Sequence, residues 1–472
     1  MRTLAEWLAL QESVHPKTID MGLARVAAVA RVLGLDRPAC PVITVGGTNG
    51  KGSTVAHLEA LVRAAGASTG GFTSPHFVRY NERIRVDGVE VGDAELSNAF
   101  ERIESARGTT TLTFFEYNTL AALLLFADRA VDVAILEVGL GGRLDATNLI
   151  DADVAVVCSI GFDHQDWLGD SLELIGAEKA GIFRSGRPAV LGTQDMPASV
   201  FSIIARLDAH AVVAGKDFRW RVEPPREIEH EATSAQRPTN QTLDFPATPG
   251  EPHWSYDGLR VSLRDLPPSA LAGSIQYRNA ATALAALEAL DLSAASGTRA
   301  PGGRRRVSLA LNERTVAQAL RAVRLAGRLQ IVPVDEVEWI LDIAHNEPAA
   351  QVFAGHLRER PVLRPPPGRS AKGRTLAVVG ILGDKDARAI AQALAALVDH
   401  WIVCSLPGPR GVPAAELAQR LGLPSADITV AATVEAGCEI ARATAKAGDR
   451  VLVFGSVYTV GPALEWLRIY SA

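Results

Sequence analysis

Residues 41–66 place a β-branched segment, a glycine-rich loop and an alanine-rich helix in direct succession, and this order constrains the fold more than any other feature. The segment "PVITVGG" (41–47) is apolar and ends in glycines, and positions 53–66 have a helical pattern. Continuous apolar strands of this length suit a parallel sheet that is covered on both faces. A strand, a loop and a helix in this order predict the first unit of an α/β fold.

The same alternation continues along the first half of the chain. "VDVAILEVG" (131–139) and "DVAVVCSIG" (153–161) predict two more buried strands. Helical patterns separate the strands, at 53–66, 93–106, 117–129 and 171–180. We therefore expect a P-loop-type, doubly wound N-terminal domain with a mostly parallel sheet.

A second α/β set begins near residue 332 and predicts a smaller, Rossmann-like C-terminal domain. Its strands are expected at 337–344, 375–382, 400–406 and 450–456, and its helices at 386–399, 413–421 and 434–446. We place the domains at 1–329 and 330–472, with the ligand site in the cleft between them.

The part of the chain between these two sets has a different amino-acid composition. Residues 221–260 are rich in Pro, Thr and Glu and predict strands with a long exposed loop. A helix is expected at 279–290, followed by a Gly/Arg loop at 296–308. We interpret the arginine run of that loop as solvated, although a phosphate patch is the alternative.

Composition excludes several classes of function. A length of 472 residues favours two domains, and a net charge of −5 disfavours a dedicated nucleic-acid binder. The four cysteines are far apart, which suits small apolar fillers in a reducing compartment. The first residues do not form a signal peptide, and no 18-residue apolar run occurs. We expect a cytoplasmic protein without nucleic-acid or membrane partners.

The loop "VGGTNGKGST" (45–54) has the context of a phosphate-binding loop, because it joins a strand to a helix. It departs twice from G-x-x-x-x-G-K-[ST]: Val45 replaces the first glycine, and Gly52 separates Lys51 from Ser53. Its glycines free backbone N–H groups for an anion, and the helix N-terminus adds a positive end. Lys51 would reach the outer phosphates. The alternative is a glycine-rich turn without a ligand.

Two polar residues end the next two predicted strands at the edge where α/β sheets bind ligands. Glu137 closes the segment 131–139, and His164 follows the segment 153–161. A carboxylate there could ligate Mg²⁺ beside the phosphate loop. The alternatives are an ion-paired or helix-capping Glu137 and a structural His164.

Nine motifs in order resemble one known family over nearly the whole chain. Together they are similar to the bacterial bifunctional dihydrofolate synthase/folylpolyglutamate synthases, members of the Mur ligase superfamily of ATP-dependent amide ligases. The motifs are "GGTNGKGST", "TSPHFVRYNERIRV", "TFFEYNTLAA", "LEVGLGGRLDATN", "SIGFDHQDWLG", "EKAGIFR", "NAATA", "LDIAHN" and "FGSVYTV". Three loop-like stretches, 221–256, 296–308 and 361–374, look longer than the family leads us to expect.

The resemblance implies an activity and its ligands. The family adds L-glutamate to dihydropteroate, giving dihydrofolate, and to the γ-carboxylate of tetrahydrofolate, giving folylpolyglutamates. Each reaction passes through an acyl phosphate made from ATP. The resemblance implies ATP as co-substrate and two Mg²⁺ sites, allows a monovalent cation, and suggests a monomer.

The resemblance also implies residue roles. Lys51, Lys179 and His345 would be catalytic, and Ser74, Glu137 and His164 would bind metal, with Ser53 as a plausible helper. Lys179 by its local sequence is a surface lysine at a helix end. The matching lysine of the family is carbamylated by CO₂, and its carbamate oxygens would face the second Mg²⁺. The ATP-binding residues would be Thr48, Asn49, Gly50, Lys51, Asn279, Arg328 and Asp342.

For the pterin substrate the resemblance points to three segments. Phe114 and Phe115 would offer aromatic faces, although core packing is the ordinary role of such a pair. Asp145 and Glu116 could accept hydrogen bonds from pterin N–H groups, although Asp145 could instead cap the turn that follows it. The segments are Thr18, Ile19, Asp20, Met21; Thr113, Phe114, Phe115, Glu116; and Leu144, Asp145, Ala146.

Three other functions compete with this interpretation. A monofunctional folylpolyglutamate synthase would share every ATP motif but lack the dihydropteroate pocket. A cell-wall Mur ligase would place a UDP-sugar domain before the phosphate loop, and a loop that begins by residue 46 leaves no room for one. A noncatalytic nucleotide switch is disfavoured because Lys51, Glu137 and His164 are all present.

Overall fold

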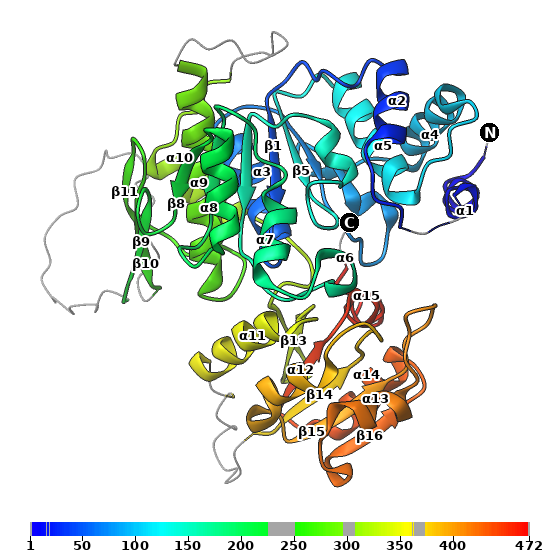
Figure 1. Ribbon diagram of the computed structural model, residues 1–472. Coiled ribbons are helices and arrows are strands. Elements are labelled where there is room, and N and C mark those ends of the chain that lie inside the picture. The colour runs from blue at the N-terminus through cyan, green and yellow to red at the C-terminus, as the bar shows by residue number, and fades with distance from the viewer. Residues whose placement is uncertain are drawn as a thin grey trace, which may run out of the picture.

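The computed structural model describes residues 2–15, 17, 19–224, 251–295, 307–360, 362 and 373–470. These residues form two α/β domains, one above the other in Figure 1. Thr18, the arginine run at 304–306 and most of the long loops expected within 221–256, 296–308 and 361–374 lie outside the described residues.

The N-terminal domain is built on an eight-stranded sheet of order β4-β3-β2-β5-β1-β6-β7-β8. The strands from β2 to β8 in this order pair in parallel, and β3 and β4 add an antiparallel edge. The strands are β1 (Val42–Gly46), β2 (Thr69–Phe72), β3 (Ile84–Val86), β4 (Val89–Glu90), β5 (Val133–Glu137), β6 (Val154–Val157), β7 (Pro188–Leu191) and β8 (His210–Val213).

The three strands expected from the sequence are the neighbours β5, β1 and β6 at the centre of this sheet. Val45 of β1 pairs with Glu137 of β5, and Gly46 pairs with Val157 of β6. The parallel register brings the carboxyl ends of all three strands to one edge of the sheet. The phosphate loop, Glu137 and the segment after β6 therefore meet there, as the sequence predicted.

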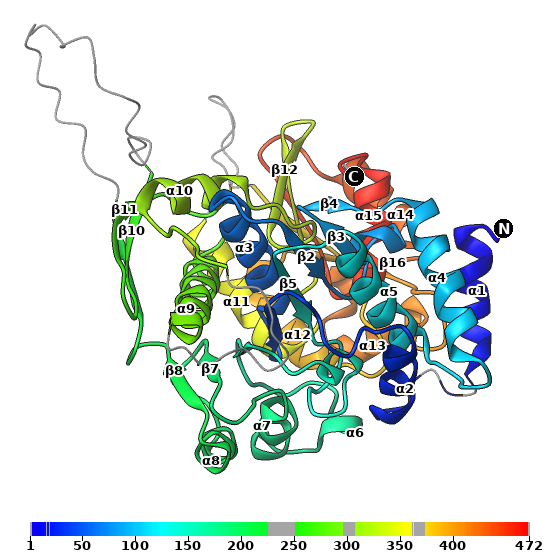
Figure 2. The same cartoon turned by 90° about the horizontal axis from the view of Figure 1, so that it is seen from above.

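Alternate side chains of the central strands divide the helices between the two faces of the sheet. Ile43 and Val45 pack with α3, α9 and α10, whereas Val42 packs with α1, α2, α4 and α5 on the opposite face. Figure 2 shows these layers from above. The helices are α1 (Leu4–Val14), α2 (Ala24–Val32), α3 (Lys51–Ala64), α4 (Asp93–Arg107), α5 (Phe114–Asp128), α6 (Gln165–Leu168), α7 (Leu172–Ala180), α8 (Ala198–Leu207), α9 (Ile275–Ala295) and α10 (Glu313–Ala322), with 3-10 turns η1 (Tyr80–Arg83) and η2 (Ala146–Leu149).

A small antiparallel sheet of order β11-β10-β9 lies at one end of the N-terminal domain. Its strands are β9 (Arg219–Glu223), β10 (His253–Asp257) and β11 (Ser262–Leu266). Buried Glu288 of α9 accepts hydrogen bonds from the Tyr256 hydroxyl (2.6 Å) and from the backbone N–H of Arg260 (2.7 Å). These bonds fix the hairpin of β10 and β11 against α9.

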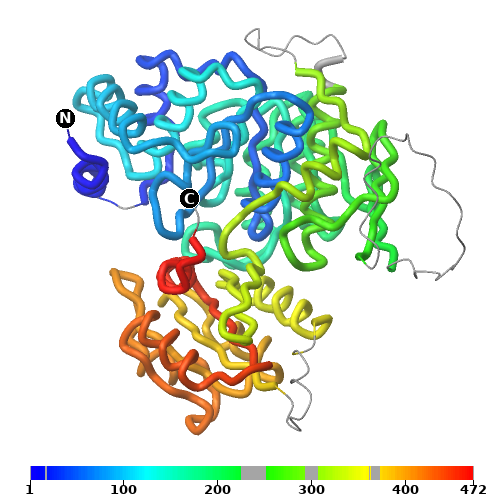
Figure 3. The backbone as a smooth tube through the Cα atoms, turned by 180° about the vertical axis from the view of Figure 1, so that it is seen from behind, coloured from blue at the N-terminus to red at the C-terminus, as the bar shows by residue number. Residues whose placement is uncertain are grey.

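The C-terminal domain has a six-stranded sheet of order β12-β13-β17-β14-β15-β16, parallel except for β12. One face packs with α11 to α13 and the other with α14 and α15. Figure 3 shows α15 beside the N-terminal domain. The elements are β12 (Gln330–Val334), β13 (Val337–Asp342), α11 (Glu347–Glu359), β14 (Thr375–Val379), α12 (Ala387–Leu394), η3 (Ala395–Leu397), β15 (His400–Cys404), α13 (Ala414–Leu421), η4 (Ser425–Asp427), β16 (Ile428–Ala431), α14 (Val434–Thr444), β17 (Arg450–Phe454) and α15 (Val457–Trp466).

Element boundaries shift where a capping residue decides the start of a helix. Helix α5 begins at Phe114, three residues before the expected start, because Thr113 and Glu116 form a reciprocal capping box. Helix α3 begins at Lys51 because Gly50, with φ of 90°, ends the loop. All four cysteines are buried, as expected of apolar fillers. Within the described ranges, no helix is long and apolar enough to cross a membrane.

Candidate active site

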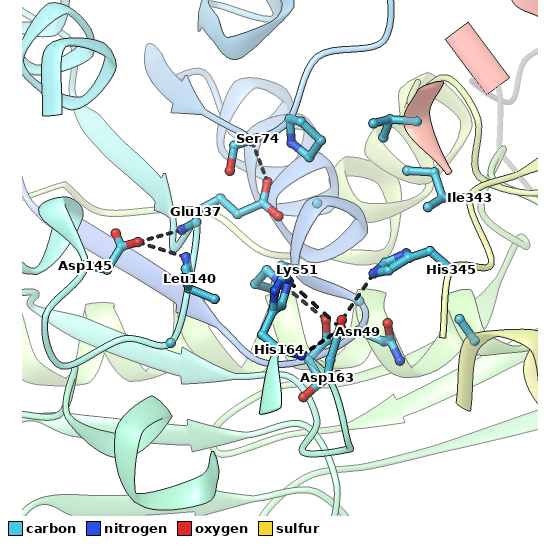
Figure 4. A pocket seen from close by; sticks show the side chains of 18 of the residues that line it. Asn49, Lys51, Ser74, Glu137, Leu140, Asp145, Asp163, His164, Ile343 and His345 are labelled. Atoms are coloured by element: carbon cyan, nitrogen blue, oxygen red, sulfur yellow. Dashed lines mark hydrogen bonds and ion pairs between the residues drawn. The ribbon is translucent and has the colours of Figure 1, made fainter. Parts of the chain in front are cut away.

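A cavity of about 450 Å³ collects side chains from both domains at the carboxyl edge of the large sheet. Every described residue that the sequence assigned to a site lines this cavity, with the exception of Phe114. Figure 4 shows Lys51, Glu137 and His164 turned toward the same space, with His345 across from them.

The phosphate loop owes its shape to the strand beside it. The Thr48 N–H donates to the Ser159 carbonyl at 2.7 Å. Gly47 has φ of 135°, and a methyl group on it would meet the Cys158 backbone nitrogen at 3.0 Å, so a larger residue does not fit. Lys51 Nζ donates to the carbonyls of Gly47 (3.0 Å) and Thr48 (3.1 Å). The lysine thus lies over the loop at the N-terminus of α3.

Glu137 lies next to Ser74 as the sequence led us to expect. The Ser74 N–H donates to Glu137 Oε2 at 3.1 Å, and the side chain of Glu137 is buried. Burial raises the pKa of Glu137 above its usual value, and the charge of Lys51 opposes part of that rise. A buried carboxylate of this kind is stabilised by a cation.

The donor set fits a hard divalent cation. In the described part of the chain, no group of three or more His, Cys, Asp and Glu side chains is arranged to hold a metal ion. The Glu137 carboxylate and the Ser74 and Ser53 hydroxyls, all lining the cavity, would fill only part of a shell. Mg²⁺ suits such a site because it keeps waters and phosphate oxygens as its other ligands.

His164 lies at the turn after β6 in a left-handed conformation, with φ of 52°, at the N-cap position of α6, where its side chain makes no capping hydrogen bond. Burial lowers its pKa to about 4, although neighbouring Asp163 acts in the opposite direction. The imidazole is therefore neutral near pH 7, which is the form that ligates metals.

Lys179 is buried, whereas its local sequence alone predicted a surface lysine. Its side chain is only 5% exposed, and Nζ donates to the Gly47 carbonyl at 3.1 Å. Burial lowers the pKa of Lys179 to about 7, and the positive charge of Lys51 adds to this effect. Two amines share one carbonyl oxygen here, so a neutral Lys179 relieves their repulsion.

Asp163 is a site residue that sequence reasoning missed. Its carboxylate receives hydrogen bonds from His345 Nε2 (3.2 Å) and Asn346 Nδ2 (3.1 Å), and forms an ion pair with Lys385. Asn346 also exchanges amide hydrogen bonds with Asn49 of the phosphate loop, at 3.1 and 3.2 Å. Burial alone would raise the pKa of Asp163, but its partners hold that pKa well below the usual range. Because His345, Asn346 and Lys385 come from the C-terminal domain, these contacts join the domains at the site.

The residues expected to bind ATP across the cavity are already held in place. Asp342 accepts hydrogen bonds from the backbone N–H groups of Leu329 (2.8 Å) and Ala344 (2.9 Å). Asn279 Nδ2 donates to Gln276 Oε1 at 3.0 Å. Burial lowers the pKa of Arg328, whereas Asp342 and Glu137 favour its charge. Arg328 and Asp342 thus bring a charged pair to the cavity.

The predicted pterin segments form the other end of the cavity, with one departure. Phe115 lines the cavity and packs against Phe72 at a ring distance of 5.7 Å. Phe114 instead packs edge-on against Tyr80 at 5.8 Å and lies outside the lining. The pair alternates between core and cavity because neighbouring helical positions point in different directions.

Both carboxylates expected to meet the pterin already have partners in the protein. Asp145 accepts from the N–H groups of Gly139 (3.0 Å) and Leu140 (2.9 Å) and from the Thr147 hydroxyl (2.6 Å), so it caps η2. Glu116 accepts from the Thr113 N–H at 2.7 Å and lies 3.2 Å from Arg25 Nη2. The hydrogen bonds of each carboxylate within the protein therefore hold the wall of the cavity in place.

Comparisons with known proteins agree with this architecture. The Mur ligase middle domain matches residues 45–217, and the Mur ligase glutamate ligase domain matches residues 327–457. The dihydrofolate synthase/folylpolyglutamate synthase of Escherichia coli strain K12 is 41% identical over 462 residues, covering 98% of this chain and 95% of that protein.

Solved structures are similar over nearly the whole chain. The E. coli FolC structure in complex with DHPP and ADP has a TM-score of 0.82 at 40% identity, and the match covers 99% of this chain and 98% of that one. A bifunctional folylpolyglutamate synthase/dihydrofolate synthase with Mn, AMPPNP and L-glutamate bound has a TM-score of 0.81 at 38% identity, with the same coverage.

Fold and site together define an ATP-dependent ligase of the Mur type, because both Mur domains are matched in order and the phosphate loop lines a cavity to which both contribute. Within that class, the chain belongs to the dihydrofolate synthase/folylpolyglutamate synthase family.

Proposed function

We propose that this protein uses ATP to add L-glutamate both to dihydropteroate and to the γ-carboxylate of tetrahydrofolate. The observation that carries the proposal is the single cavity in which a phosphate loop, a buried carboxylate and an aromatic-lined pocket meet. The relatives named above support it, since they bear both activities in their names.

At the nucleotide end, Thr48, Asn49, Gly50 and Lys51 would hold the triphosphate through backbone N–H groups and the lysine ammonium. Lys51 now donates to two loop carbonyls and would turn to the phosphates when they bind. Asn279, Arg328 and Asp342 would also contact ATP, with Arg328 on phosphates and Asp342 on ribose hydroxyls. Their positions in the lining agree with this assignment.

Ser74 and Glu137 would hold one Mg²⁺, with His164 at a second. With these residues holding it, Mg²⁺ would supply positive charge to the phosphates during phosphoryl transfer.

The reaction couples two displacements. A carboxylate oxygen of the pterin substrate attacks the γ-phosphorus, the bond to the β-phosphate oxygen breaks, and ADP leaves. The amine of glutamate then attacks the carbonyl carbon of the acyl phosphate, inorganic phosphate leaves, and the amine loses a proton. The side chains of the site would act mainly by positioning the reactants and by neutralising the charge of the phosphoryl group. His345, oriented by Asp163, would face the reacting phosphate or the glutamate.

For Lys179 we propose a carbamate. A neutral amine adds CO₂ and loses a proton, which turns a cation into an anion with two hard oxygens. The lowered pKa and burial of Lys179 favour the neutral amine that this chemistry needs. The carbamate would then orient the second Mg²⁺ near His164.

The pterin would lie at the end lined by Ile19, Asp20 and Met21, with Phe115 offering an aromatic face. Asp145, Glu116 and Thr113 would act on it chiefly by fixing the wall, since their own hydrogen bonds hold the loop and the helix start. Leu144 and Ala146 complete that wall.

A coupled assay of ADP release tests the proposal. ADP formation that requires both L-glutamate and dihydropteroate as the only pterin would support two activities. If ADP formed with tetrahydrofolate and glutamate but not with dihydropteroate and glutamate, the protein would be a monofunctional folylpolyglutamate synthase. No turnover with either pterin would favour a nucleotide-binding switch.

A further inference from the structure

Arg278 lies in the first turn of α9 and lines the cavity beside Asn279. It is outside every motif that the sequence assigned to ATP. A methyl group built on Gly50, the residue that caps the phosphate-loop helix, would lie 3.6 Å from Arg278 Nη2 and 3.0 Å from Asn279 Oδ1. The guanidinium therefore lies directly against the loop.

In the part of the chain that the structure describes, no acidic partner accounts for Arg278. Among the described residues, no carboxylate lies within ion-pairing distance of it, and the ionisable group that acts on its pKa is the thiol of Cys158. Burial lowers the pKa of Arg278, so its charge is partly desolvated, and no carboxylate of the described residues compensates for that cost.

Two helix N-termini and a lysine add positive charge near Arg278. It lies at the N-terminal end of the 21-residue helix α9, where the helix dipole disfavours a cation. The N-terminus of α3 and the ammonium of Lys51 lie on the same wall, and Lys51 and Arg278 both act on the Cys158 thiol. An anion between these groups would relieve the repulsion among them.

We propose that Arg278 binds a phosphate oxygen of the nucleotide, as an additional phosphate-binding residue beside the loop. The inference rests on the proposed function, because it requires that this cavity holds ATP. A guanidinium presents N–H groups in a fixed fork that matches phosphate oxygens, and such charge-assisted bonds are stronger than neutral ones. Arg278 would thus hold the nucleotide from α9 while Lys51 holds it from α3.

The other chemistry open to a guanidinium face is stacking on the adenine ring. Stacking would make Arg278 contribute equally to adenosine and to ADP. Phosphate binding would make its contribution depend on the phosphates and on salt, because ions screen partly exposed charges.

Isothermal titration of ADP and of adenosine into the full-length protein separates these two roles. The variants are Arg278→Gln and Arg278→Lys. The matched control is Arg206→Gln, which removes an exposed arginine of α8 away from the cavity. Circular dichroism and thermal unfolding of each variant confirm that it is folded.

We expect Arg278→Gln to weaken ADP binding about tenfold, the size of one charge-assisted hydrogen bond. Arg278→Lys should recover part of this loss, the affinity for adenosine should stay unchanged, and the salt dependence of ADP binding should decrease in Arg278→Gln. An unchanged affinity for ADP in a folded Arg278→Gln protein, or an equal loss for adenosine, would overturn the inference. Failure of the wild-type protein to bind ADP would instead overturn the proposed function.

Discussion

Replacement of Asp163 by asparagine tests whether the polar contacts between the two domains assemble the site. The amide would keep the size of the side chain but leave the Lys385 ammonium, 7% exposed, without its main counter-charge. Asp384 lies 3.6 Å from the same ammonium and would compensate only in part. Removal of one partner of a buried ion pair destabilises the structure that contains it by about 3–5 kcal/mol. Because Asp384 compensates in part, we expect the lower value, about 3 kcal/mol, for this pair.

If the state in which both domains form the site is destabilised by about 3 kcal/mol, kcat/KM should decrease about 100-fold. The assay is ADP release with saturating glutamate, on Asp163→Asn, Lys385→Met and the double variant. The double variant should be no worse than the poorer single variant, because both changes break one interaction.

The exposed ion pair of Asp335 and Arg442, with side chains 62% and 57% exposed, is the matched control. Its removal should cost less than about 1 kcal/mol of stability and leave kcat/KM unchanged. Losses in Asp163→Asn and Lys385→Met that simply add, or single variants with wild-type activity, would refute the idea that this pair assembles the site.

Three further predictions concern other residues. Lys179→Ala should lose most ligase activity, and acetate should restore part of it; a fully active variant would show that no carbamate is needed. His57 is buried between the Ser53 carbonyl (2.7 Å) and the Ser269 hydroxyl (2.9 Å), and burial lowers its pKa to about 4. Because the unfolded state takes up this proton first, folding stability should fall as pH decreases from about 6.5 to about 4, by up to about 3 kcal/mol for this group. The free energy of unfolding of His57→Gln, measured in urea, should therefore fall less than that of the wild type over this pH range. The same pH dependence in both proteins would contradict the prediction. Asp145→Ala should lower kcat/KM for dihydropteroate more than for tetrahydrofolate, and an equal loss would give Asp145 a purely structural role.

The centre of the N-terminal domain was predictable from sequence because its signals are local. A β-branched segment, the glycines after it and the helix that follows are adjacent in the chain, and they form β1, the loop and α3. Glu137 was placed correctly since it ends a strand that pairs directly with β1.

Side-chain surroundings were less predictable, because they depend on packing between distant segments. Asp163 and Lys385 are 222 positions apart, and nothing near either residue indicates that they meet. The burial of Lys179 has the same origin, since its acceptor is the carbonyl of Gly47, 132 positions away. Phe114 packs against Tyr80 outside the cavity lining while Phe115 lines it, and which of two neighbouring helical positions faces a cavity depends on where distant segments pack.

The division of the chain at 329/330 remains our proposal. Strand β12 starts at Gln330, and Leu329 already packs with the core of the C-terminal domain. The segment around Arg328 therefore lies at the junction and supplies side chains to the cavity.

The most direct test of the account is the pair of ligase activities of Lys51→Ala, measured as ADP release and as glutamylated product. One phosphate loop is proposed to serve both reactions, so the variant should lose both dihydropteroate and tetrahydrofolate ligation while its thermal unfolding stays close to that of the wild type. Loss of one activity with the other near the wild-type rate would contradict a single ATP site.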